Sequence, residues 1–192
     1  MKSRVLFALL AALLAATGCS TDNNETQRVV CSVQSINDGN PVVSAAVNTG
    51  ADAGNLSDDY VPLDFVPVLF YARPGNSVMT IPEDGAYSAF IVTAYDAVWE
   101  PGAGAPAQLT DYNVTRGLLS ARVPVNDEFT VAFPIAPQEM KAEAWYPAQY
   151  SGTVFTANLA LTFYGHAEGS DHEVAVPAGT TVTFLGAVGQ TN

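Results

Sequence analysis

Alternating apolar and polar residues dominate the chain beyond residue 28. The clearest run extends from Phe155 to Phe163, where every second residue is apolar and most residues between are polar. A period of two places one face of a β-strand in a core and the other in solvent. Similar runs predict further strands at Val29–Val33, Leu63–Tyr71, Ala89–Trp99, Leu118–Val125, Phe129–Ile135, Val174–Val176 and Thr181–Leu185. About eight short strands indicate a β-sandwich, not a parallel α/β sheet.

Turn-forming residues separate these runs, in stretches such as NDGNP, RPGN and EGSD. Glycine, proline, asparagine and aspartate bend the chain at low energetic cost. The stretch APQEMKAEAWY has helix-forming content and predicts a short helix or turn between strands. Pro62, Pro67 and Pro124 fall within or beside predicted strands, which places those segments at sheet edges or bulges.

The stretch AFIVTAYDAVWEP, beginning at Ala89, is apolar on both faces if it forms a regular strand. One face then carries Ile91, Thr93, Tyr95, Ala97 and Trp99, and the other carries Phe90, Val92, Ala94, Asp96 and Val98. Such a strand belongs away from a sheet edge. Trp99 with its following Glu-Pro pair resembles the central tryptophan strand of immunoglobulin-like sandwiches, without the paired cysteines of antibody domains. We therefore expect an all-β fold, an antiparallel immunoglobulin-like β-sandwich of about eight strands, with Tyr95 and Trp99 in its core.

The N-terminus has the order of a secretory signal peptide: Lys2 and Arg4, an apolar stretch, then small residues before Cys19. The apolar stretch is shorter than the about 20 residues that a membrane-spanning helix needs. Ala16-Thr17-Gly18-Cys19 resembles the lipobox of bacterial lipoproteins, although leucine is the usual residue where Ala16 stands. The resemblance implies that a signal peptide of residues 1–18 is removed and that acyl chains such as palmitate attach to Cys19. An ordinary cleaved signal is the alternative.

Two cysteines occur in the chain, and lipidation of Cys19 leaves Cys31 without a partner for an intramolecular disulfide. Export to an oxidising compartment favours disulfides, so a Cys19–Cys31 bond is the competing interpretation. With Cys19 lipidated, we expect Cys31 to be a small buried core residue.

The chain divides into the signal peptide, a polar tether of residues 19–28 and a β-sandwich domain of residues 29–192. The full chain has 192 residues and a formal charge of −12, and without residues 1–18, which hold two basic and no acidic residues, the charge is −14. This balance repels nucleic acid, because the basic surface that nucleic-acid binding needs is missing. One domain of this size can bury a core without disulfides.

The order of VPLDFVPVLFYARP, FIVTAYDAVWEP, VPVNDEFTVAFPIAP and ANLALTFYGHAEGSDHEVAVPAGTTVTF is similar to that in a group of uncharacterised bacterial lipoproteins. These proteins are built as a single β-sandwich with a late TFYG-like strand followed by a hairpin. The resemblance spans most of the chain after the signal peptide. It implies fold and export, and it brings no activity.

Two clusters could bind metal ions. If AEGSD is a hairpin loop, His166 and His172 are cross-strand neighbours that could share zinc or copper, with Glu168, Asp171 or Glu173 completing the shell. Polar surface at a hairpin tip is the alternative. The stretch DAGNLSDD offers oxygen ligands for calcium, although it lacks the regular spacing and glycine of an EF-hand loop, which favours a solvated acidic loop. Its candidate ligands are Asp52, Asn55, Asp58 and Asp59.

No catalytic signature appears in the sequence. A serine or cysteine nucleophile would need His166 or His172 as its base, and there is no G-x-S-x-G elbow. We therefore expect a non-enzymatic binding or structural protein without a cofactor, anchored in the bacterial envelope, with an envelope protein or a surface ligand as its partner. Ser20 resembles the residue that directs enteric lipoproteins to the outer membrane. Two alternatives are a small hydrolase and a glycan- or metal-binding module, whose exposed tyrosines would cluster on one face: Tyr87, Tyr112 and Tyr150.

Overall fold

Two β-sheets enclose the core of the protein. The computed structural model describes residues 28–48, 59–76, 80–81, 85–148 and 154–188, and in this part the fold is all-β with eight strands. The three-stranded sheet has the order β1 (Val29–Ile36), β3 (Asp64–Pro74) and β6 (Glu128–Ala136). The five-stranded sheet has the order β2 (Val42–Asn48), β8 (Val174–Val188), β7 (Phe155–Ala167), β4 (Ala89–Pro101) and β5 (Val114–Pro124).

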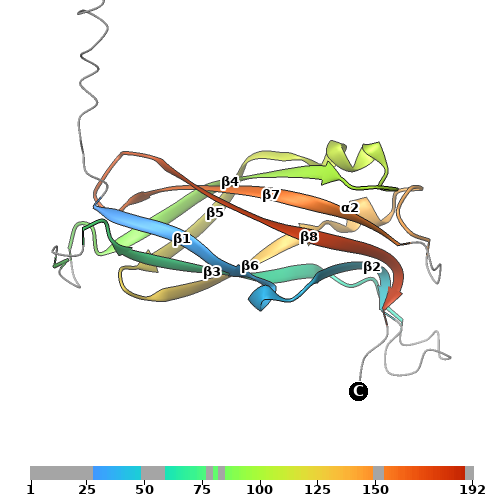
Figure 1. The fold of residues 1–192 in the computed structure, drawn as a ribbon, viewed down its shortest axis with the longest axis horizontal. Coiled ribbons are helices and arrows are strands. Elements are labelled where there is room, and N and C mark those ends of the chain that lie inside the picture. The colour runs from blue at the N-terminus through green and yellow to red at the C-terminus, as the bar shows by residue number, and fades with distance from the viewer. Residues whose placement is uncertain (1–27, 49–58, 77–79, 82–84, 149–153, 189–192) are drawn as a thin grey trace, which may run out of the picture.

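The strands run along the long axis of the molecule, so that the fold has two ends (Figure 1). Strands β1, β4, β6 and β8 begin at one end, which we call the β1 end. The opposite end, which we call the α2 end, carries the short helices η2 (Ala107–Tyr112) and α2 (Gln138–Lys141). A further short helix, η1 (Asn37–Gly39), connects β1 with β2.

The N-terminal strands are divided between the two sheets. Strand β1 pairs antiparallel with β3, and after η1 the chain enters the other sheet, where β2 pairs parallel with β8. All other pairings between the named strands are antiparallel. The connection through η1 therefore carries the chain from an edge strand of the three-stranded sheet to an edge strand of the five-stranded sheet.

Aromatic rings from both sheets meet in the core. Phe163 on β7 is fully buried and lies edge-to-face against Phe70 on β3, with 4.9 Å between ring centroids. The same ring contacts Phe133 on β6 at 5.7 Å. Burial of such large apolar side chains is the main favourable contribution to folding, and it holds the two layers together.

The sequence predicted most strands, and the differences have local causes. Strand β7 and the short helix α2 confirm their predictions. The strand β2 was not predicted, because Val42–Asn48 lacks a period of two and is buried at most of its positions. The two predicted strands near the C-terminus form one continuous strand, β8, which pairs with β7 on both sides of Pro177.

Strand β4 differs from the regular strand that the sequence predicted. The pairing of β4 with β7 shifts by one residue between Val92 and Ala94, so Thr93 is the extra residue of a β-bulge. A one-residue shift exchanges the two faces of a strand. Phe90 and Val92 therefore share the core-facing side with Trp99, and their predicted placement on the opposite face is wrong. The prediction that this strand lies inside the sheet is confirmed.

Prolines within strands lie where one side of the strand has no neighbour. Pro67 belongs to the middle strand β3, yet the pairing of β3 with β1 begins only at Val68. Pro177 on β8 likewise precedes the segment that pairs with β2. Since proline cannot donate a backbone hydrogen bond, these positions avoid the loss of a sheet contact. Among the described residues, no helix is long and apolar enough to span a membrane.

Candidate binding site between the sheets

A partly enclosed groove opens between the two sheets in the α2 half of the molecule. Its volume is about 300 Å³. Strands β4 and β5 form one wall, and the end of β6 with the chain entering α2 forms the other. We call this the aromatic groove, and its lining residues of greatest interest are Tyr95, Trp99, Tyr112, Asn113, Phe133 and Pro134. Its size and mainly apolar lining are typical of small-molecule sites.

Core packing fixes the walls of the aromatic groove. Tyr95 from β4 lies edge-to-face against Phe133 from β6, with 4.9 Å between centroids. Trp99 is buried and packs its ring against Phe184 of β8 at 5.5 Å. The backbone N–H of Trp99 donates to Oδ1 of Asn113 at 2.7 Å, which holds the start of β5 beside the end of β4. The groove is thus shaped by contacts that exist without a ligand.

The rim of the aromatic groove is the end of η2, where Tyr112 lines the groove and contacts the segment after α2. The hydroxyl of Tyr112 donates to Oε1 of Glu143 at 3.0 Å. The ring of Tyr112 contacts the half-buried Trp145 edge-to-face, at 6.1 Å between centroids. Burial raises the pKa of Tyr112, and the hydrogen bond to Glu143 with the charges of Glu143, Glu139 and Asp111 raises it further. Aromatic rings and carboxylates therefore meet at this rim.

A buried ion pair attaches α2 to the body of the fold. Nζ of Lys141 lies 2.9 Å from Oδ1 of Asp64 and also donates to the carbonyl of Pro62 at 2.6 Å. The two charged side chains are only 3% and 7% exposed. Ser44 on β2 donates to Oδ2 of Asp64, and its hydroxyl also contacts the hydroxyl of Tyr146. This cluster links β2, β3 and α2, and it borders a second hollow of about 500 Å³.

Burial has the largest effect on the pKa values of Asp64 and Tyr146 in this cluster. It raises the pKa of Asp64, although the hydrogen bonds from Ser44 and Lys141 and the positive charge of Lys141 act in the opposite direction. Burial also raises the pKa of the Tyr146 hydroxyl. Since the hydroxyls are hydrogen-bonded inside the protein, the cluster positions α2 and offers no exposed nucleophile.

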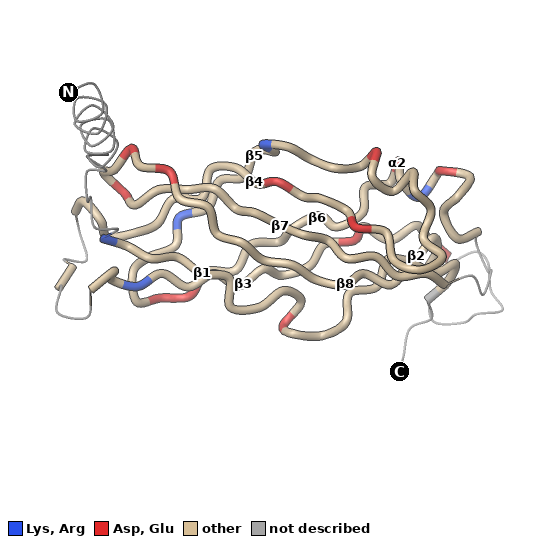
Figure 2. The backbone as a smooth tube through the Cα atoms, turned by 45° about the horizontal axis from the view of Figure 1, so that its top comes forward, with Lys and Arg blue, Asp and Glu red and all other residues tan. Residues whose placement is uncertain are grey.

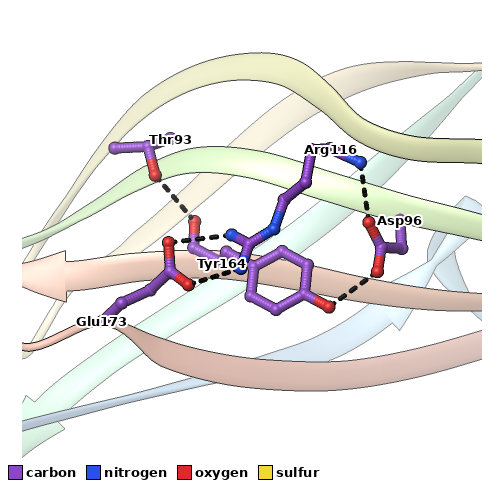
Figure 3. A network of polar contacts seen from close by, with 5 residues as sticks. All are labelled: Thr93, Asp96, Arg116, Tyr164 and Glu173. Atoms are coloured by element: carbon purple, nitrogen blue, oxygen red, sulfur yellow. Dashed lines mark hydrogen bonds and ion pairs between the residues drawn. The ribbon is translucent and has the colours of Figure 1, made fainter.

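A polar network on the outer face of the five-stranded sheet connects three strands and the β7–β8 loop (Figure 3). Asp96 on β4 accepts hydrogen bonds from the backbone N–H of Arg116 at 2.8 Å and from the hydroxyl of Tyr164 at 2.7 Å. The guanidinium of Arg116 binds both carboxylate oxygens of Glu173 at 2.8 and 2.9 Å. It also lies 3.8 Å from the centre of the Tyr164 ring.

Both carboxylates of this outer network, Asp96 and Glu173, accept hydrogen bonds from Arg116. The backbone hydrogen bond from Arg116 lowers the pKa of Asp96, and the guanidinium lowers the pKa of Glu173. A similar contact lies nearer the β1 end, where Arg122 binds Glu168 at 2.9 Å and lowers its pKa. Exposed pairs of this kind stabilise folds weakly, so we interpret both as cross-strand connections on the sheet surface.

The two histidines lie differently from the cross-strand pair that the sequence predicted. The pairing of β7 with β8 ends with Gly165 opposite Val174, so the next step of the register places Glu173 opposite His166. His172 lies in the loop, where its backbone N–H donates to Oγ of Ser170 at 3.2 Å. The described residues contain no group of three or more His, Cys, Asp or Glu side chains that could hold a metal ion. Metal binding by these histidines stays a prediction.

Several predicted positions lie outside the described residues. These are Cys19 and three of the four acidic-loop ligands, Asp52, Asn55 and Asp58, while Asp59 is described next to a short bridge between Asn48 and Tyr60. Cys31 is buried on β1, which confirms its predicted place in the core. Its burial raises the pKa of the thiol to about 12. The thiol is therefore neutral and unreactive at ordinary pH.

The exposed tyrosines suggested for glycan binding do not gather on one face as far as they are described. Tyr87 precedes β4 at the β1 end, and Tyr112 follows β4 at the α2 end. Tyr150 lies outside the described residues. Of the three, Tyr112 belongs to the aromatic groove.

Comparisons of the chain with protein-family models, curated proteins and solved structures gave no match. Sequence reasoning identified Tyr95 and Trp99 as core residues but not as walls of a groove. Phe133, Asn113 and Glu143 carried no local signal, because their roles depend on β6 and η2 lying beside the end of β4.

Proposed function

We propose that this chain is an exported bacterial lipoprotein whose β domain binds a small, mainly apolar ligand in the aromatic groove. The lipid on Cys19 would hold the domain in the cell envelope, most simply at the outer membrane. In this function the protein is not an enzyme. The single observation that carries the binding role is the groove itself, preformed between the sheets and lined by aromatic rings.

The strand order supports an immunoglobulin-like β-sandwich. The neighbours β3 and β6 correspond to strands B and E of that fold, and β4, β7 and β8 correspond to C, F and G. Strand β5 then takes the place of C′ beside C. Trp99 lies on the strand that corresponds to C, where immunoglobulin domains carry their buried tryptophan. Many domains of this architecture serve as binding modules, with the chemistry set by their particular surfaces.

The lining of the groove favours binding over bond cleavage. The residues that line it include tyrosines, a tryptophan, a phenylalanine, prolines and Asn113, but no carboxylate, histidine, lysine or serine. General acid–base and nucleophilic catalysis need such groups within hydrogen-bond reach of the reacting atoms. The groove can therefore hold and orient a ligand, and among the described residues its lining offers only tyrosine hydroxyls for such chemistry.

Replacing Cys19 by alanine tests the anchor. We expect Cys19→Ala to move the protein from the membrane fraction to the soluble fraction, because the acyl chains would have no attachment point. Cys31→Ala is the matched control and should stay with the membranes, since Cys31 is buried in the domain. Cys19→Ala protein that still sediments with membranes after a salt wash would contradict lipid anchoring.

Filling the aromatic groove tests the binding site. Val114 lines the groove, so Val114→Phe should obstruct it, whereas Val98→Phe adds the same ring to the outer face of β4. We expect benzyl alcohol, as a neutral aromatic probe, to shift the NMR signal of the Trp99 indole in a saturable way. Saturable binding should persist in Val98→Phe. The affinity of Val114→Phe for benzyl alcohol should be at least tenfold lower than that of the wild type. Absence of saturable binding to the wild type, or equal binding by both variants, would reject the groove as the site.

A further inference from the structure

Three carboxylates lie near the hydroxyl of Tyr112, a residue that lines the aromatic groove. Glu143 accepts the hydrogen bond from the Tyr112 hydroxyl, and the charges of Glu139 and Asp111 also act on that hydroxyl. All three carboxylate side chains are exposed to solvent. Because Tyr112 lines the groove, a ligand that enters beside it meets negative charge at the rim and aromatic rings further inside.

Most basic residues of the described part of the chain lie away from the α2 end (Figure 2). Arg28, Arg73 and Arg122 belong to the β1 end, and Arg116 is bound to Glu173 on the outer sheet face. Lys141 is the basic residue of the α2 end, and it is buried against Asp64. Within the described part of the chain, no cation therefore forms an ion pair with Asp111, Glu139 or Glu143, in a protein whose formal charge is already −12.

The strand edges beside the groove are poorly suited to accept an added peptide strand. On β6, Pro134 lines the groove and has no backbone N–H to donate. On β5, Arg116 has a positive φ of 55°, and the pairing with β4 shifts between Tyr95 and Ala97. Prolines and bulges of this kind prevent strand addition at sheet edges. The groove is thus better matched to a small molecule than to an extended peptide.

We propose that the aromatic groove binds an organic cation with an apolar body, such as an aromatic or alkyl ammonium compound. This inference rests on the proposed function. The apolar body would lie against the rings of Tyr95 and Phe133, and the ammonium group at the rim beside Tyr112 and Glu143. Tyrosine and tryptophan rings attract cations through their negative faces, and carboxylates add long-range attraction. A volume of about 300 Å³ accommodates one ring with a short substituent.

Benzyltrimethylammonium and benzyl alcohol form the pair of probes for the experiment, because they share the ring and differ in charge. We expect the wild type to bind the cation at least fivefold more tightly than the alcohol at low salt, measured by NMR titration of the tryptophan indole signals. The preference should decrease as salt screens the rim carboxylates. Equal affinity for the two probes would overturn the proposed cation preference and leave the binding function intact.

Glu143→Gln is the decisive variant, since glutamine keeps an acceptor for the Tyr112 hydroxyl and removes the charge. We expect it to lose most of the preference for the cation while its affinity for benzyl alcohol stays within twofold of the wild type. Glu128→Gln, an exposed position at the β1 end, is the matched control and should keep the preference. An unchanged preference in Glu143→Gln would overturn the inference. Failure of both probes to bind the wild type would instead reject the proposed function itself.

Discussion

Lys141→Met is expected to lower the free energy of unfolding by about 3–5 kcal/mol. The substitution removes the cation from a pair that is almost fully buried and leaves the carboxylate of Asp64 without its charged partner. An unpaired buried charge is costly, because neither water nor a counter-ion compensates it. Urea denaturation at pH 7, followed by circular dichroism, measures the loss.

A second substitution separates the ion pair from simple packing loss. In Lys141→Met/Asp64→Asn no buried charge remains, so we expect the double variant to lie within about 2 kcal/mol of the wild type and above both single variants. Strong coupling is expected because the two side chains are in direct contact. If the losses of the two single variants simply add, the stabilising role of the pair is refuted.

The loss of stability in Lys141→Met should depend on pH in a defined direction. Burial raises the pKa of Asp64 in the folded protein above its unfolded value of about 3.9. The contribution of Asp64 to the free energy of unfolding is therefore fully present below about pH 4. It is lost as the pH rises through the folded-state pKa. Removing Lys141 raises that pKa further, so the difference between wild type and Lys141→Met should be smaller at pH 4 than at pH 7. An identical difference at both pH values would contradict this account.

Gly165→Ala is expected to destabilise the protein by about 2–3 kcal/mol. A Cβ at this position would lie 2.3 Å from the carbonyl oxygen of Ile91 and 2.5 Å from the ring of Phe90. Both neighbours belong to β4, which pairs with β7 along most of its length, so the backbone has little freedom to move away. Thermal unfolding of the variant beside the wild type provides the measurement.

Gly179→Ala on the neighbouring strand β8 is the control for this substitution. Its Cβ would come no closer than 3.3 Å to another atom, the carbonyl oxygen of Leu159. Replacing glycine by alanine also restricts the unfolded chain, which favours folding slightly. We expect a change within about 1 kcal/mol of the wild type. Comparable losses in the two variants would show that glycine flexibility matters more than the close approach of β4 and β7.

How far the candidate site could be predicted is clearest for its aromatic residues. The periodic pattern identified Tyr95 and Trp99 as inward-facing, and the structure places both in or against the core. Tyr112 was recognised as an aromatic residue on a loop, without a partner. The groove appears only when Phe133 from β6 lies opposite Tyr95, a contact between residues far apart in sequence. No local pattern encodes that pairing.

The sequence by itself determined the all-β character, most of the strands and the burial of Cys31, because each depends on residue type and a period of two. Only the tertiary structure decided the bulge at Thr93, which turns Phe90 and Val92 to the same side as Trp99. It likewise decided the ion pair between Asp64 and Lys141, which are 77 residues apart. Such features depend on which strands become neighbours and in which register. A local alternation specifies which face of a strand is buried, but not what the buried face meets.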